Sequence, residues 1–155
     1  MSAFRIVPFV SAHLPEAADL WIAAWTRAMP AIDFEARRAW FVDHVVALQA
    51  RGADIVCAFS AADGRMVGFV THEKPGNVDQ LCVAADAWGS GAATALLNAV
   101  KRLSGGSLSL DVNQDNARAV RFYEREGFRR VRAGLNPSSG LATWRYEWVD
   151  ISCVG

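Results

Sequence analysis

The sequence predicts a single α/β domain over residues 1–150, in which a mixed sheet of about seven strands is flanked by about four helices, with residues 151–155 as a short tail. Three observations support this fold class. Strand-like and helix-like segments alternate along the chain, a hairpin signal occurs near its middle, and a strand–helix–strand–helix order follows residue 78. With 52% hydrophobic residues and six Trp, the chain can fill a sizeable core without metal or disulfide support.

The first half of the chain is predicted to contain one strand, two helices and three further strands. A strand over Phe4–Phe9 precedes a helix that follows Pro15, carries apolar residues on one face and is stopped by Pro30. Asp33 can cap a second amphipathic helix that runs to about Arg51. The next strands are predicted at 54–60, 65–72 and 78–83, and the short linker between the first two indicates an antiparallel hairpin.

The second half follows a different order, with helices between strands. A helix from about Gly91 to Ser104 separates the strand that ends at Val83 from an alternating strand over Leu108–Val112. A second helix spans about Asn116 to Glu126, and two closing strands are predicted at 128–133 and 143–149. Because strands joined through a helical crossover are normally parallel, the sheet is predicted to be antiparallel at its front and parallel here.

The charge balance and the cysteines limit the classes of partner. Sixteen Lys and Arg residues against sixteen Asp and Glu residues give no net charge, which argues against nucleic acid and an anionic membrane as partners. The three cysteines, Cys57, Cys82 and Cys153, are far apart and show no metal-ligand spacing. We therefore expect reduced thiols, no metal site and, since the sequence shows no secretory signal or spanning segment, a cytoplasmic protein.

One loop of small residues joins a predicted strand to a predicted helix; it comprises Trp88, Gly89, Ser90, Gly91, Ala92 and Ala93. The first N–H groups of a helix lack backbone partners and carry a partial positive charge, so the loop predicts a local phosphate site. It can equally serve only to pack a helix tightly on the sheet. A nucleotide-binding Gly-Lys-[Ser/Thr] sequence is absent, and the dinucleotide pattern G-x-G-x-x-G has Thr94 at its third glycine.

A second motif lies on the helix that follows the alternating strand. Asn116 and Tyr123 are seven residues apart, two helical turns, so a cap amide and a phenol point to the same side. The run from Asn116 to Phe128 fits the pattern Asn-x-x-Ala-x-x-[Phe/Leu]-Tyr-x-x-x-Gly-Phe. The sequence therefore places a cap amide and a phenol on the same side of this helix.

Together the two motifs resemble those of the GNAT superfamily of acyl-CoA-dependent N-acyltransferases. The Tyr motif is matched throughout, and the order of elements agrees over nearly the whole chain. The loop matches the family pattern [Arg/Gln]-x-x-Gly-x-[Gly/Ala] at Gly91 and Ala93, but Trp88 stands where the family usually has Arg or Gln. Since the contacts there are mainly backbone N–H groups, this departure concerns affinity more than identity.

The resemblance implies a mostly antiparallel central sheet with a V-shaped parallel splay that holds the pantetheine arm of acetyl-CoA. It implies that the strand segment Leu81, Cys82 and Val83 binds this arm, and that N–H groups around Cys82 and Val83 stabilise the oxyanion of a tetrahedral intermediate. The expected acetyl-CoA site further includes the loop from Trp88 to Ala93 and the side chains Asn113, Asn116 and Tyr123.

The implied reaction moves an acetyl group from sulfur to an amine. Tyr123 is the predicted proton donor for the departing thiolate, although a role in the aromatic core would also explain it. Asp111, twelve residues before Tyr123, is the predicted base because some family members carry an acidic residue there; a solvated carboxylate is the alternative. Asp79, Glu73 or an ordered water are further candidates for the base. A nucleophilic Cys82 is a rival mechanism, against the ordinary role of a buried strand cysteine.

The resulting hypothesis is an N-acetyltransferase that moves the acetyl group of acetyl-CoA directly to a primary amine of a small molecule or peptide. A catalytically silent acyl-CoA sensor or assembly domain is the alternative, and a dinucleotide-binding domain is a more remote one. The sequence leaves open the identity of the amine, the length of the acyl group and whether the chain forms a homodimer.

Overall fold

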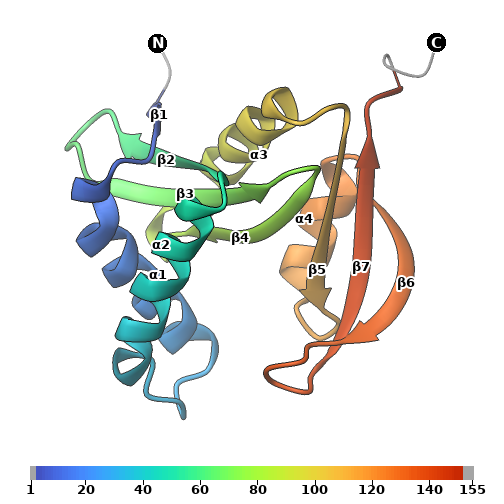
Figure 1. Ribbon diagram of the computed structural model, residues 1–155, viewed down its shortest axis with the longest axis horizontal. Helices are drawn as coiled ribbons and strands as arrows, with labels where there is room; N and C mark the ends of the chain where they lie inside the picture. Colours follow the sequence, from blue (N-terminus) through green and yellow to red (C-terminus); the bar gives the residue numbers. More distant parts are fainter. Residues whose placement is uncertain (1–2, 152–155) are drawn as a thin grey trace.

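The computed structural model describes residues 3–151 and consists of one seven-stranded sheet with helices on both faces (Figure 1). The strands are β1 (Phe4–Pro8), β2 (Asp54–Ser60), β3 (Met66–Glu73), β4 (Asn77–Val83), β5 (Ser107–Asn113), β6 (Arg129–Leu135) and β7 (Ala142–Val149). The helices are α1 (Leu14–Ala28), α2 (Arg38–Ala50), α3 (Ala92–Leu103) and α4 (Ala117–Arg125). This arrangement confirms the predicted fold class. Residues 152–155 of the predicted tail, with Cys153, lie outside the described residues.

The predicted bounds agree with the observed ones to within one or two residues, except at the start of α2. There a 3-10 turn over Glu35–Arg37 has Phe34 as its N-cap, and the carboxylate of Asp33, one residue earlier, accepts a hydrogen bond from the Ala36 amide at 3.2 Å. The α-helix proper begins only at Arg38. The Asp33 side chain therefore bonds to the first helical turn, as a capping residue would, but it lies one residue before the N-cap, and this turn is the tighter 3-10 form.

The sheet order β1-β2-β3-β4-β5-β7-β6 contains one parallel pair among the described strands, β4 with β5. These two strands meet at the pair Asn77–Ser109 and through a 2.7 Å bond from the Ser109 amide to the Gly76 carbonyl. A Cβ on Gly76 would lie 2.7 Å from the Ser107 carbonyl oxygen, so only glycine permits this approach. Beyond this apex β4 and β5 separate, which confirms the predicted V-shaped splay.

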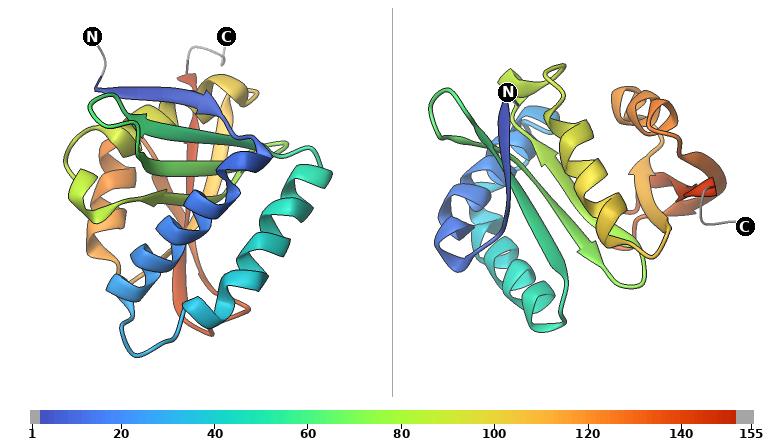
Figure 2. Two further views of the ribbon diagram at one scale, coloured as in Figure 1. Left: turned by 90° about the vertical axis from the view of Figure 1, so that its left-hand side faces the viewer. Right: turned by 90° about the horizontal axis from the view of Figure 1, so that it is seen from above.

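Helices α1 and α2 cover one face of the sheet, and α3 and α4 cover the other (Figure 2). Because both faces are covered, β2 and β3 are buried along nearly their whole length. One apolar cluster includes Trp21, Phe41 and Phe69; the other includes Tyr123 and Tyr146. No helix within residues 3–151 is long and apolar enough to cross a membrane.

Candidate active site

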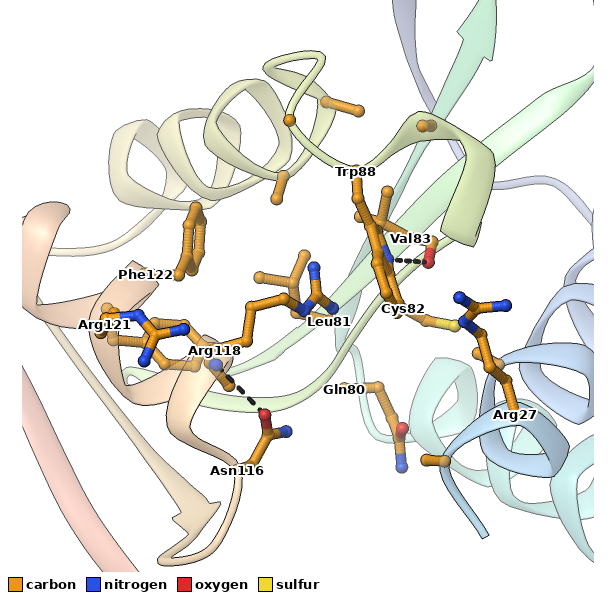
Figure 3. Close-up of a pocket in the computed structure, with 18 of the residues that line it drawn as sticks. Arg27, Gln80, Leu81, Cys82, Val83, Trp88, Asn116, Arg118, Arg121 and Phe122 are labelled. Atoms are coloured by element: carbon orange, nitrogen blue, oxygen red, sulfur yellow. Dashed lines mark hydrogen bonds between the residues drawn. The ribbon is translucent and has the colours of Figure 1, made fainter. Parts of the chain in front are cut away.

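A pocket of about 870 Å³ lies where β4 and β5 diverge, and we call it the splay pocket (Figure 3). Its walls come from the C-terminal half of α1, residues 80–83 of β4, the loop before α3, Asn113 at the end of β5, and α4. Of the twelve residues predicted to bind acetyl-CoA, all but Ser90 line this pocket. The structure therefore brings together the strand, loop and helix segments that the sequence separates by up to 42 positions, from Leu81 to Tyr123.

The loop before α3 presents backbone amides to the splay pocket. Gly89 has φ +76° and Gly91 has φ +94°, left-handed values at which a side chain would be strained. The Ser90 hydroxyl instead turns into the loop, donating to the Ala87 carbonyl and accepting from the Ala92 amide at 3.4 Å. Since the first backbone bond of the helix runs from Ala95 to Gly91, the N–H groups at its start have no carbonyl partner within the helix. These groups suit a phosphate.

The backbone of β4 presents alternate residues to the splay. The Ala84 amide bonds to the Val67 carbonyl of β3, and Phe69 is the register partner of Cys82. By the alternation of an antiparallel ladder, the backbone groups of Cys82 then point to β3 and those of Leu81 and Val83 point to the gap. The predicted pantetheine contacts thus fit Leu81 and Val83, whereas the Cys82 amide faces its sheet neighbour.

Helix α4 places the polar side chains of the second motif at the splay pocket. Asn116 caps the helix, since its Oδ1 accepts from the Ala119 amide at 3.1 Å, and its side-chain NH₂ is left for a ligand. Tyr123, one turn from the end, is buried between Phe122 and Phe128 and lines the pocket. A phenol is protonated at neutral pH at its ordinary pKa of about 10, as a proton donor must be, and burial raises the pKa of Tyr123 further.

The predicted base lies on the other face of β5. Asp111 is exposed and does not line the splay pocket; its carboxylate pairs with Arg145 Nη1 at 3.2 Å, and Arg145 Nη2 also donates to Ser109 Oγ at 2.8 Å. The neighbouring Leu110, by contrast, packs in the same cluster as Tyr123. The structure therefore separates the predicted acid and base by the thickness of the sheet.

The other candidate bases and the rival nucleophile also have defined partners. Asp79 Oδ2 lies 2.7 Å from His44 Nε2, and Glu73 pairs with Arg51 at 3.2 Å. Burial raises the pKa of the Cys82 thiol to about 12, and its Sγ donates to the Leu20 carbonyl at 3.9 Å. A thiol held protonated in this way is a poor nucleophile.

Sequence reasoning missed the arginines of the splay pocket. Arg118, Arg121 and Arg125 line it from α4, and Arg27 lines it from α1. The first three are spaced by three and four residues, a helical face that could have been recognised beside Asn116 and Tyr123. No comparable signal marks Arg27. Four arginines and one carboxylate, that of Asp115, thus line the pocket, although the chain as a whole has no net charge.

Metal chemistry has no evident ligand set. Among residues 3–151 there is no group of three or more His, Cys, Asp or Glu side chains placed to hold a metal ion. Cys57 and Cys82 are free and buried.

Comparison with known proteins identifies the family to which the chain belongs. The model of the acetyltransferase (GNAT) family matches residues 14–128. The chain therefore belongs to this family, which confirms the resemblance of its two motifs. The peptidyl-lysine N-acetyltransferase YiaC of Escherichia coli strain K12 is 31% identical over 86 residues, or 56% of this chain and 58% of that protein. The chain thus spans somewhat more than half the length of this relative.

Solved structures show the same fold. The PaiA N-acetyltransferase of Thermoplasma acidophilum, in complex with coenzyme A, has a TM-score of 0.78 at 14% identity, over 96% of this chain and 99% of that one. The ribosomal-protein-S18-alanine N-acetyltransferase of Escherichia coli has a TM-score of 0.73 at 17% identity, over 95% and 94% of the two chains. The splayed seven-stranded sheet is therefore shared with acetyltransferases of distant sequence.

Proposed function

We propose that this protein is an N-acetyltransferase that moves the acetyl group of acetyl-CoA directly to a primary amine of a small molecule or peptide. The observation that carries the proposal is the splay pocket, in which unpaired strand backbone, helix-start amides and the buried Tyr123 phenol line one cavity. Membership of the GNAT family supports it, as do the coenzyme A complex of PaiA and the peptidyl-lysine activity in the name of YiaC.

Each part of acetyl-CoA has a matching surface in this proposal. The pantetheine amides pair with the backbone of Leu81 and the amide of Val83 as an added strand would, because these groups face the gap between β4 and β5. The Val83 carbonyl already accepts a hydrogen bond from Trp88 Nε1. The loop amides of Gly89, Gly91 and Ala93 take phosphate oxygens, whereas those of Trp88 and Ser90 already bond to the carbonyls of Ala85 and Ala87. The side chains of Asn113 and Asn116 line the same pocket and complete the polar wall.

The proposed chemistry is a direct transfer. The neutral amine attacks the thioester carbonyl, a C–N bond forms, the C–S bond breaks, and the amine loses one proton while the thiolate gains one. Tyr123 donates the proton to sulfur, and backbone N–H groups of β4 that face the gap stabilise the oxyanion. The raised pKa of Cys82 favours this route over an acetylated cysteine.

Asp111 remains the proposed base, with a water as the alternative. A thioester carbonyl in the gap would be reached by an amine from the α1–α2 face, and Asp111 lies on that face of β5 while Tyr123 lies on the other. The acid and base would then act from opposite sides of the sheet. The amine itself, the cytoplasmic location and a homodimer stay predictions.

The test is to incubate the protein with acetyl-CoA and a panel of amines, polyamines, aminoglycosides and lysine peptides, and to follow the release of free thiol. Release above the blank with any acceptor supports the proposal. Saturable binding of acetyl-CoA without turnover across the panel would instead support a silent acyl-CoA sensor. Thermal stabilisation by NADH and not by acetyl-CoA would overturn both hypotheses in favour of a dinucleotide site.

A further inference from the structure

The ring of Trp88 lies inside the splay pocket with an arginine on each side (Figure 3). Its Nε1 donates to the Val83 carbonyl at 3.2 Å, which fixes the ring over the end of β4. The guanidinium carbon of Arg118 is 3.4 Å from the ring centroid, and that of Arg27 is 5.1 Å away. The three side chains come from α4, the loop and α1, so they connect helices on opposite faces of the sheet.

The two guanidinium groups have no acidic partner within the part of the chain that the structure describes. Neither Arg27 nor Arg118 takes part in an ion pair, whereas most other charged contacts of the protein join an arginine to a carboxylate. Burial, and then the charge of Arg27, lower the pKa of Arg118. Two like charges are thus held near each other in a partly enclosed pocket, an arrangement that an anion would stabilise.

The position of the stack gives the anion a chemical class. It adjoins the helix-start amides of the loop from Trp88 to Ala93, and Arg121 and Arg125 line the same pocket. A guanidinium that stacks on an indole keeps its N–H donors in its own plane, where they can bind a phosphate through two hydrogen bonds. In the family pattern a cationic or amide side chain usually stands at position 88, and here that position is apolar.

We propose that Arg27 and Arg118, held on either side of the Trp88 ring, bind a phosphate group of coenzyme A in place of the side chain that the family pattern has at position 88. The inference rests on the proposed function and adds to it. Because Arg27 belongs to α1, donor binding would also fix the helix that covers the opposite face of the sheet.

The test measures the dissociation constant of CoA by calorimetry for the wild type, Arg27→Gln and Arg118→Gln, with Arg102→Gln as the matched control. Arg102 is exposed in the last turn of α3 and does not line the pocket. Loss of one charge-assisted phosphate contact is expected to raise the dissociation constant about tenfold in each pocket variant, with a smaller salt dependence, and to leave the control unchanged. Melting temperatures confirm that the variants fold.

Two ligands identify the phosphate. If the stack binds the 3′-phosphate, 3′-dephospho-CoA will bind the wild type and the pocket variants equally; if it binds the pyrophosphate, dephospho-CoA will lose affinity as CoA does. Trp88→Arg combined with Arg118→Gln should recover affinity by returning a cation to the loop. Equal CoA affinity in Arg27→Gln, Arg118→Gln and the control would overturn the proposed phosphate contact of the two arginines and leave the proposed function standing. A wild type that binds no CoA would overturn the proposed function and the proposed phosphate contact together.

Discussion

Replacement of Tyr123 by Phe is the most direct test of the proposed chemistry. The variant keeps the ring, whose centroid lies 5.2 Å from that of Phe122 and 5.5 Å from that of Phe128, so packing and fold should be nearly unchanged. What is lost is one O–H group of a residue that lines the splay pocket, and burial raises the pKa of this phenol above its usual value.

The expected loss in kcat follows from the chemistry of the leaving group. General acid catalysis contributes about 10²–10⁴-fold in rate, and a thiol with a pKa of about 8.5 needs less help than an alcohol. We therefore expect the lower end, a loss of about 100-fold or about 2.7 kcal/mol of transition-state stabilisation. The affinity for acetyl-CoA should change by less than about threefold, because the hydroxyl acts chiefly in the transition state.

The assay is steady-state thiol release between about pH 6 and pH 9, a range in which the raised pKa of Tyr123 keeps the wild-type phenol protonated. The matched control is the other tyrosine of the chain, Tyr146→Phe. Its hydroxyl donates to Glu124 Oε2 at 2.9 Å outside the pocket, so that variant should lose about 1–3 kcal/mol of stability with kcat unchanged. A Tyr123→Phe enzyme with wild-type kcat at every pH would refute the assignment of Tyr123 as the acid.

Three further predictions concern the base, the thiol and the loop. Asp111→Asn should lower kcat about tenfold or more near neutral pH, and the kcat of the variant should recover as rising pH deprotonates the amine substrate. A pH–rate profile identical to that of the wild type would assign the base elsewhere. Cys82→Ala should keep kcat within a few fold and give no acetylated enzyme by intact mass, since the pKa of about 12 keeps the thiol protonated; loss of activity in a folded variant would contradict this. Gly91→Ala should lower the free energy of unfolding by about 1–2 kcal/mol because Gly91 has φ +94°, and it should weaken CoA binding. A Cβ at this position would meet no atom within 4 Å, so backbone strain alone is tested, and an unchanged melting temperature would count against that strain.

The sequence was sufficient for those parts of the site that are local in the chain. The seven-residue spacing of Asn116 and Tyr123 determines which side of α4 they share, and small residues reveal a loop of exposed amides wherever it folds. Three other features depend on tertiary packing. Arg27 reaches the pocket because α1 is oriented by its own apolar face, and Asp111 meets Arg145 through the register of β5 with β7. Such register is not encoded in either strand alone.

The surroundings of Trp88 also depend on tertiary packing and could not be predicted from the sequence. The sequence places an aromatic residue where the family pattern has Arg or Gln, which suggests a weakened anion site. In the folded chain this ring lies between two arginines from distant segments, 61 and 30 residues away by the positions of Arg27 and Arg118. The missing Arg or Gln at position 88 can therefore be offset by arginines that are distant in the sequence but lie beside Trp88 in the fold.

The apex of the V at Gly76 and Ser109 has a consequence for the evolution of stability in this fold. Beyond the apex, β4 and β5 leave backbone groups unpaired that a closed sheet would use for its own cohesion. Substitutions that brought the strands together would complete the ladder and stabilise the chain, and in doing so would remove the opening through which it acts. Selection for activity thus keeps this sheet incomplete, and heat resistance in such a chain has to be gained elsewhere.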